Sequence, residues 1–263
     1  MSIKKRLELG ILPQPDDTTC GPTCLQAVYR FHGDELNLSE VISEVHRLDH
    51  GGTYAAYLGV HALRRGYRVR LFTYNLQVFD PTWFQISREG MIERLTLRQK
   101  AKAETPQAQA IHAYLDFMNT GGDVEFQDLN AKLIRGFLKR GIPILTGLSS
   151  TYLYQTMREH GPEMEDDDVR GDPSGHFVVL CGYDKEDRTV LVADPMHPNP
   201  AFHGLQYVVE MDRVVCAILL GILTHDADML IIEKPAGHPA PLVLDLPLPT
   251  TPPSAMPDPP GAR

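Results

Sequence analysis

The segment QPDDTTCGPTCL, residues Gln14–Leu25, is the point at which a polar loop turns into a helix. Pro22 falls in the first turn of that helix, where its missing backbone N–H costs no hydrogen bond. Apolar side chains then recur at helical spacing as far as Phe31, and Gly33 supplies an end signal. Cys20 therefore stands at the helix N-terminus, where unpaired N–H groups and the positive end of the helix dipole favour a thiolate.

The composition is that of a soluble globular protein. Of the 263 residues, 43% are hydrophobic and 22% are charged, and the net charge is −9. No stretch combines basic residues with interleaved aromatic residues. The most apolar segment, residues 214–223, is half as long as the roughly 20 residues of a membrane span, and the N-terminus lacks the apolar core of a signal peptide. We therefore expect a cytoplasmic protein that binds neither nucleic acid nor a membrane.

The cysteines raise the question of a metal site. The spacing Cys20-x3-Cys24 is compatible with zinc, but no second pair of Cys or His residues has the spacing of a zinc site. We therefore predict no metal and no cofactor. Cys24 lies one helical turn after Cys20 on the same face, so it is either a resolving thiol for an oxidised Cys20 or a packing residue, and we expect packing.

Helices are predicted mainly in the first half of the chain and strands in the second. Further helices are predicted over residues 39–48, 53–65, 87–104, 105–119 and 126–140, and strands over residues 67–74, 142–148, 176–182, 189–193, 206–210 and 214–223. This order indicates an α+β fold, an N-terminal helical lobe packed on a C-terminal antiparallel β-sheet. We expect one domain over residues 1–235, with a helical insertion at about 84–125, and a Pro-rich disordered tail over 236–263.

Three further residues are candidates to act with Cys20. His176 opens one predicted strand and Asp194 ends the next, so a hairpin through residues 183–188 would bring them side by side. A carboxylate on one imidazole nitrogen leaves the other nitrogen to take the thiol proton. Gln14, in the loop before the helix, can join the Cys20 N–H as an oxyanion donor. Each residue alone has an ordinary structural explanation, and their joint placement at the ends of elements favours catalysis.

These residues belong to three motifs that occur in a fixed order. They are Gln14-x5-Cys20-Gly21-Pro22-x-Cys24, then GHFVVL-x-GY over residues 175–183, then Val192-x-Asp194-Pro195. Together they resemble the C39 and C39-like cysteine peptidases of the papain-like superfamily, over residues 11–33 and about 142–223. The resemblance implies a papain-like fold with the active site between a helical lobe and a β lobe. It also implies that Gln14 binds the oxyanion, Cys20 is the nucleophile, His176 the base and Asp194 its orienting partner.

The resemblance implies a cysteine peptidase or amide hydrolase that cleaves a peptide or related amide bond through a thioester. Members that cut leader peptides are joined to a membrane transporter, and no membrane span is predicted here, so the substrate is left open. Two alternatives use the same residues: an amide transferase, and a non-catalytic peptide-binding module. The oligomeric state also stays open.

Two other features lie close to the predicted site in sequence. The segment EMEDDDVRGD, residues 163–172, is expected to be a solvated loop, but folded over the cleft it would favour a substrate with a cationic group. Tyr152 and Tyr154 follow a predicted strand, and we expect them to pack, with lining of the cleft as the alternative.

Overall fold

The computed structural model describes residues 4–49, 51–235 and 243–244. Within these residues one nine-stranded sheet runs through the molecule, with strand order β11-β1-β7-β4-β10-β2-β3 and with β8 and β9 continuing from β7. Its strands are β1 (Lys4–Leu7), β2 (Arg68–Thr73), β3 (Asp123–Glu125), β4 (Ile144–Ser149), β7 (Gly175–Asp184), β8 (Thr189–Ala193), β9 (Gln206–Glu210), β10 (Asp228–Glu233) and β11 (Val243–Leu244). Two short strands, β5 (Glu159–His160) and β6 (Glu165–Asp166), form a separate hairpin.

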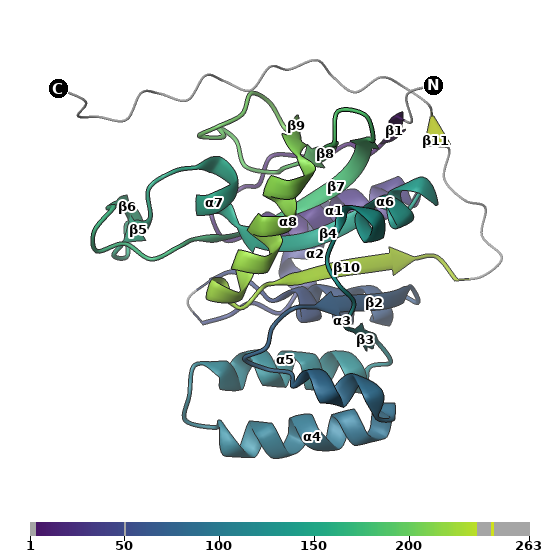
Figure 1. The fold of residues 1–263 in the computed structure, drawn as a ribbon, viewed down its shortest axis with the longest axis vertical. Helices are drawn as coiled ribbons and strands as arrows, with labels where there is room; N and C mark the ends of the chain where they lie inside the picture. Colours follow the sequence, from purple (N-terminus) through teal and green to yellow (C-terminus); the bar gives the residue numbers. More distant parts are fainter. Residues whose placement is uncertain (1–3, 50, 236–242, 245–263) are drawn as a thin grey trace.

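Helices cover both faces of this sheet (Figure 1). They are α1 (Cys20–Phe31), α2 (Leu38–Glu44), α3 (Ala55–Arg64), α4 (Arg88–Ala101), α5 (Gln107–Asn119), α6 (Ala131–Lys139), α7 (Ser150–Tyr154) and α8 (Met211–Leu220), with 3-10 turns η1 (Pro81–Gln85) and η2 (Gly221–Thr224). In Figure 1, α8 lies in front of the sheet and α1 lies behind it. The predicted α+β fold is confirmed. The sheet is not confined to the C-terminal half, because β1, β2 and β3 precede residue 126, and β2 and β3 pair in parallel.

Strand β7 is the centre of the fold. Its residues 176–184 are all buried, as expected of a strand that is covered on both faces and therefore reads as a continuous apolar run. It pairs antiparallel with β4 over Gly175–Leu180 and with β8 over Val179–Asp184. The pairing with β8 brings the C-terminal end of that strand beside the N-terminal half of β7.

The prediction of a strand over residues 214–223 is wrong. This segment lies in α8 and η2, and the buried positions of α8 are Met211, Val214, Ala217 and Ile218, which share one helical face. A run in which nearly every residue is apolar has no period, so its sequence does not separate a strand from a buried helix. The sheet instead contains β10, which lies between β4 and β2 and which the sequence analysis missed.

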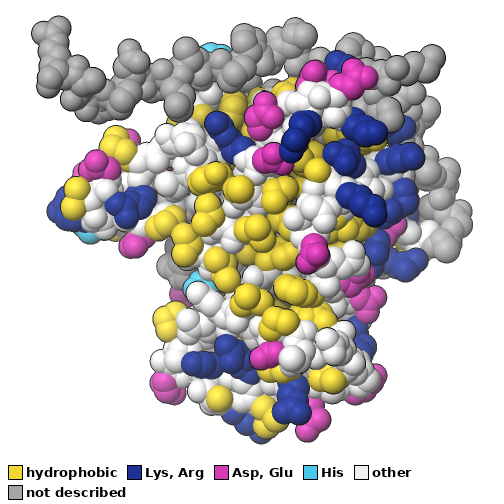
Figure 2. Space-filling model, viewed as in Figure 1, with side chains coloured by type: hydrophobic (Ala, Val, Ile, Leu, Met, Phe, Trp, Pro, Cys, Tyr) yellow, Lys and Arg dark blue, Asp and Glu magenta, His cyan; other side chains and the backbone are white. Residues whose placement is uncertain are grey.

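Three exposed leucines leave the outer side of α8 and η2 apolar. They are Leu219, Leu220 and Leu223, and Figure 2 shows hydrophobic side chains gathered over this part of the molecule.

The middle of the chain forms the helical pair α4 and α5, which packs on α3 at the lower end of Figure 1. Ser87 caps α4 by accepting a hydrogen bond from the Gly90 N–H, at the predicted start. Of the predicted tail, residues 243–244 form β11 against β1, and the rest lies outside the described residues. No helix in the described residues is long and apolar enough to cross a membrane.

Candidate active site

The start of α1 leaves the positive end of its dipole open beside Cys20. No side chain caps this helix and its first turn holds no acidic residue. The Thr19 hydroxyl, at the position where a cap would lie, is used by the preceding loop, since it donates to the Asp16 carbonyl over 3.0 Å. Cys20 itself is partly exposed.

Helix α1 is pressed tightly against β7. A Cβ at Gly21 would lie 2.9 Å from the Thr53 methyl carbon and 3.2 Å from the Phe177 ring, so the residue after Cys20 has to be glycine or its neighbours must move. One turn later the buried Cys24 thiol donates to the Phe177 carbonyl over 3.2 Å. Burial raises the pKa of Cys24 well above its usual value. Cys24 is therefore a packing residue, as expected.

His176 and Asp194 are joined directly. The ring Nε2 of His176 lies 2.8 Å from Asp194 Oδ1, and both side chains are almost completely buried. The carboxylate accepts, so Nε2 is the donor and carries a proton. The other nitrogen, Nδ1, is left for the Cys20 thiol, which lies within hydrogen-bonding range of the ring.

The charges around His176 favour its protonated form. Burial lowers the pKa of His176. The charge of Asp194 and the charge and hydrogen bond of Cys20 raise it by more than burial lowers it, so the pKa rises from 6.5 to about 10. A buried imidazole is thus balanced by an acidic group on each side. This arrangement stabilises the protonated form of the His176 ring.

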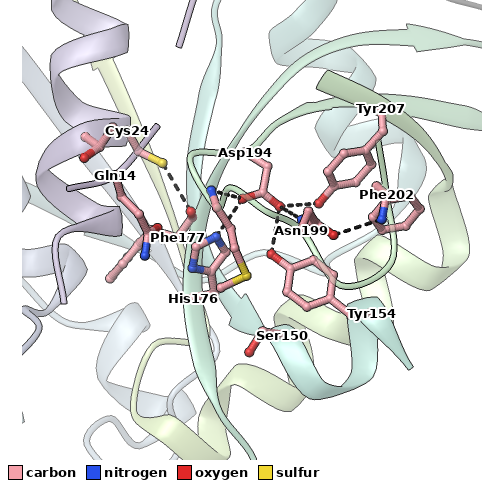
Figure 3. Close-up of polar contacts among 12 residues, drawn as sticks. Gln14, Cys24, Ser150, Tyr154, His176, Phe177, Asp194, Asn199, Phe202 and Tyr207 are labelled. Carbon is pink, nitrogen blue, oxygen red and sulfur yellow. Dashed lines mark hydrogen bonds and ion pairs between the residues drawn. The ribbon is translucent and has the colours of Figure 1, made fainter. Parts of the chain in front are cut away.

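Five donors surround the fully buried carboxylate of Asp194 (Figure 3). Oδ1 accepts from His176 Nε2 and from the Met196 N–H (2.9 Å), and Oδ2 accepts from the hydroxyls of Tyr154 (2.8 Å) and Tyr207 and from Asn199 Nδ2 (3.2 Å). Burial alone would raise the pKa of Asp194, but the charge of His176 and these hydrogen bonds lower it below its usual value. Asp194 therefore stays ionised although it is fully buried.

Two of these donors come from elements far apart in sequence. Tyr154 ends α7, and Tyr207 lies in β9, where its partner across the ladder is Val192. Because Asp194 follows Val192 by two positions, the Tyr207 and Asp194 side chains project from one face. Burial raises the pKa of both tyrosines well above the usual value, so both remain hydroxyl donors. The sequence analysis expected packing for Tyr154 and missed Tyr207, whose signal is visible only once the register is known.

Gln14 is held beside the loop that follows Asp194. Its backbone N–H donates to the Pro195 carbonyl over 2.8 Å, and its side-chain Nε2 donates to the Asp16 carbonyl over 3.0 Å. The acceptor at Asp16 settles which end of the amide is nitrogen, because a flipped amide would set oxygen against oxygen. Nε2 has a second proton that no described residue takes up.

The acidic hairpin, residues 156–174, leaves the fold at the same edge as His176. Its base is fastened by α7, since Ser150 donates its N–H and hydroxyl to the Ser174 carbonyl, each over 2.9 Å. Figure 1 shows β5 and β6 projecting away from the body next to α7. Most of its residues are exposed, as expected of a solvated loop.

Two hollows lie elsewhere on the molecule. One, of about 390 Å³, is lined by residues of α2, α3 and α5 that include Glu44, His61 and Arg64, and the other, of about 460 Å³, lies between β2 and α6. Neither hollow is lined by Cys20 or His176. In the part of the chain that the structure describes, no group of three or more His, Cys, Asp or Glu side chains is placed to hold a metal ion.

Comparisons with known proteins identify a family and similar folds. The model of the Peptidase_C39 like family matches residues 6–207. A protein described as a C39-like peptidase from Bacillus anthracis is 13% identical, with a TM-score of 0.48 over 88% of this chain and 98% of that chain. A double glycine motif protease from an AMS/PCAT transporter, solved with a leader peptide, is 13% identical, with a TM-score of 0.42 over 89% of this chain and 99% of that chain. Xylellain, a cysteine protease from Xylella fastidiosa, is 16% identical, with a TM-score of 0.41 over 88% of this chain and 85% of that chain. No curated protein is significantly similar in sequence.

Proposed function

Because this chain belongs to the peptidase C39-like family, we propose that it is a cysteine peptidase that cleaves a peptide or related amide bond with Cys20 as nucleophile. The observation that carries the proposal is the buried His176–Asp194 pair, whose free ring nitrogen is left for a thiol at the N-terminus of α1. A base, an orienting carboxylate and an activated nucleophile are the parts that thiol-dependent acyl transfer needs.

The first half of the reaction forms a thioester. The thiol proton of Cys20 passes to His176 Nδ1, and Sγ attacks the carbonyl carbon of the scissile bond. When the C–N bond breaks, the proton on Nδ1 goes to the leaving nitrogen, which departs as a neutral amine. In the second half His176 takes a proton from water, the resulting hydroxide attacks the thioester carbonyl, and the C–S bond breaks. The thiolate then recovers the proton from Nδ1, and the carboxyl product leaves.

Negative charge develops on the carbonyl oxygen in both halves. The Cys20 N–H at the uncapped start of α1 and the unused proton of Gln14 Nε2 are the donors that we assign to this oxygen. Asp194 takes no proton in this scheme. Its five hydrogen bonds keep it ionised, and it holds the His176 ring with the proton on Nε2.

The direct test compares Cys20→Ala with Cys24→Ala. A peptide library should be cleaved by the wild type and by Cys24→Ala, and Cys20→Ala should show no turnover while its thermal unfolding is unchanged. Turnover by Cys20→Ala at the wild-type rate would overturn the mechanism. A wild type that binds peptides and cleaves none would identify a binding module.

Hydrolysis and acyl transfer share every step up to the thioester. Adding a nucleophilic amine to the reaction and measuring the ratio of amide product to carboxylic acid product distinguishes the two. We expect carboxylic acid as the main product, because water is the acceptor in the proposed reaction.

A further inference from the structure

The aromatic ring of Phe177 separates Asp226 from the start of α1. It follows η2, and its Cβ would lie only 2.6 Å from a Cβ placed at Gly147 in β4. That same position is 3.2 Å from the ring of Phe177, and the other side of the ring is 3.2 Å from a Cβ placed at Gly21. The Phe177 ring therefore bridges the segment that carries Cys20 and the segment that carries Asp226.

A second path leads from Cys20 to the same carboxylate. The Thr53 methyl group packs on Gly21, and two residues later the Ala55 N–H donates to Asp226 Oδ1 over 3.1 Å. Two residues of extended chain span at most about 7 Å. Both paths place Asp226 near the start of α1, which carries Cys20.

Asp226 is buried without a cation. Its side chain is only 8% exposed, and in the described residues it takes part in no ion pair. Oδ1 is used by Ala55, whereas no described residue donates to Oδ2. Oδ2 keeps some contact with solvent, in contrast to Asp228 Oδ1, which is fully enclosed without a partner. One oxygen of Asp226 is therefore both unpartnered and accessible.

A second buried carboxyl group, that of Asp228, makes ionisation of Asp226 more costly. Asp228 is 1% exposed and holds one hydrogen bond from the Tyr114 hydroxyl, 2.6 Å long. Burial, and then the charge of Asp228, raise the pKa of Asp226 well above its usual value. Oδ1 caps α3, because it accepts from the N–H of Ala55, the first residue of that helix. A neutral acceptor such as an amide oxygen would cap the helix equally well without the cost of a buried carboxylate. A cationic group at Oδ2 would offset both effects, burial and the charge of Asp228, and favour the ionised form of Asp226.

The acidic hairpin adds negative charge to the same edge. Residues 156–174 hold seven Asp or Glu residues against two Arg residues, and Figure 2 shows the hairpin standing clear of the body. Its C-terminal end reaches Gly175, where a Cβ would lie 2.7 Å from the Thr224 hydroxyl, two residues before Asp226. The end of the hairpin and the start of β7 therefore lie against the segment that leads to Asp226.

We propose that Asp226 is the specificity residue for a basic side chain of the substrate, so that the peptide cleaved at Cys20 carries Lys or Arg within one or two residues of the scissile bond. The inference rests on the proposed peptidase function. Asp226 supplies the short-range contact through Oδ2, and the acidic hairpin attracts the basic peptide from a distance.

The test uses pairs of fluorogenic peptides that differ only in Arg against citrulline, which has nearly the same shape and no charge. The wild type should cleave the Arg peptide with a kcat/KM on the order of ten- to a hundredfold higher, the usual range for a hydrogen bond to a charged group. Asp226→Asn keeps an oxygen for the Ala55 N–H, and it should lose the preference while cleaving the citrulline peptide at the wild-type rate. Asp228→Asn is the matched control and should keep the preference.

The failure of this inference can be told apart from failure of the peptidase function. If peptides are cleaved but Arg and citrulline are equivalent, or if Asp226→Asn keeps the preference, the assignment of Asp226 is wrong and the peptidase function stands. If no peptide is cleaved, calorimetric binding of the same pairs to Cys20→Ala decides the matter: tighter binding of the Arg peptides that Asp226→Asn abolishes supports the assignment, and equal binding overturns it. Thermal unfolding of each variant shows that the fold is kept.

Discussion

Asp194→Asn tests the proposed site most sharply, because every hydrogen bond that reaches Asp194 comes from a donor. Two donors, His176 Nε2 and the Met196 N–H, meet Oδ1, and three donors meet Oδ2. Asparagine keeps one oxygen and places an N–H2 group where the other oxygen lay. One of the two sets of donors must then face another donor.

The larger set decides how the asparagine turns. With its oxygen toward the three donors at Oδ2, its N–H2 group faces His176 Nε2. The ring avoids this contact between two donors by carrying its proton on Nδ1 instead. A protonated Nδ1 cannot take the proton of Cys20. The same change of tautomer in a Ser-His-Asp triad lowers kcat by about 10⁴, and we expect kcat/KM to fall by about 10³ to 10⁴ here.

The pH dependence of stability should change as well. The pKa of His176 is raised from 6.5 to about 10, so its contribution is complete below pH 6.5 and is lost as pH rises toward 10. The pKa of Asp194 is lowered from 3.8, so its contribution is present above pH 3.8 and is lost as pH falls through the lowered value. Asp194→Asn removes the contribution of Asp194 and reduces that of His176, so the unfolding free energy should vary less with pH at both ends of the pH range.

Tyr207→Phe is the matched control for this experiment. It removes one of the three donors to Oδ2 and leaves the charge of Asp194 and the His176 tautomer in place. The loss of one such hydrogen bond should lower kcat/KM by about tenfold or less. The assay is the rate of peptide cleavage together with the rate of Cys20 alkylation. An Asp194→Asn variant within tenfold of the wild type, or one equal to Tyr207→Phe, would refute the assignment of the two ring nitrogens.

Three further changes test other parts of the structure. Gln14→Ala should lower kcat by about 10² to 10³ with little change in KM, because it removes a donor that acts only on the developing oxyanion; steady-state kinetics measure this. Gly147→Ala should lower the free energy of unfolding by about 1–3 kcal/mol, since its Cβ would lie 2.5 Å from the Asp226 carbonyl oxygen, and urea denaturation measures the loss. Burial raises the pKa of Asp228 from 3.8 to about 7, so wild-type stability should fall between those pH values, and Asp228→Asn should reduce this slope in denaturation at several pH values.

Each of these predictions has an outcome that contradicts it. An unchanged kcat for Gln14→Ala would remove Gln14 from the oxyanion site. Gly136→Ala is the control for Gly147→Ala, because a Cβ at Gly136 meets only the tip of Arg140 at 4.0 Å, and equal loss in both variants would show that crowding at Asp226 is not the cause. A wild-type stability that rises steadily from pH 4 to pH 7 would contradict the raised pKa of Asp228.

The elements that the sequence predicted well have local signals. The start of α1 follows from the loop before Cys20 and from Pro22, and the start of α4 follows from Ser87, which caps it. Strands β8 and β9 match their predicted residues because each is a short β-type run between turns. Helix α8 was mistaken for a strand because its signal depends on which apolar residues face the sheet, and that is settled by packing.

The candidate site divides in the same way. Cys20, His176 and Asp194 were recognisable as candidates because each stands at or next to the end of an element and within a short motif, and Gln14 because it shares the motif of Cys20. The donors to Asp194 from α7 and β9 were not recognisable, because a tyrosine in a helix or strand has no local mark of the carboxylate that it meets.

By itself, the sequence determined the broad class of fold and indicated the candidate site residues, since caps, prolines and apolar periods act over a few residues. Only the tertiary structure decided how Asp194 is kept ionised and that Asp226 lies near the start of α1. The reason is physical: the pKa of a buried carboxylate depends on burial and on partners from distant segments. For Asp194 and Asp226 those partners, Tyr207 and Ala55, are set by strand register and by packing across the sheet.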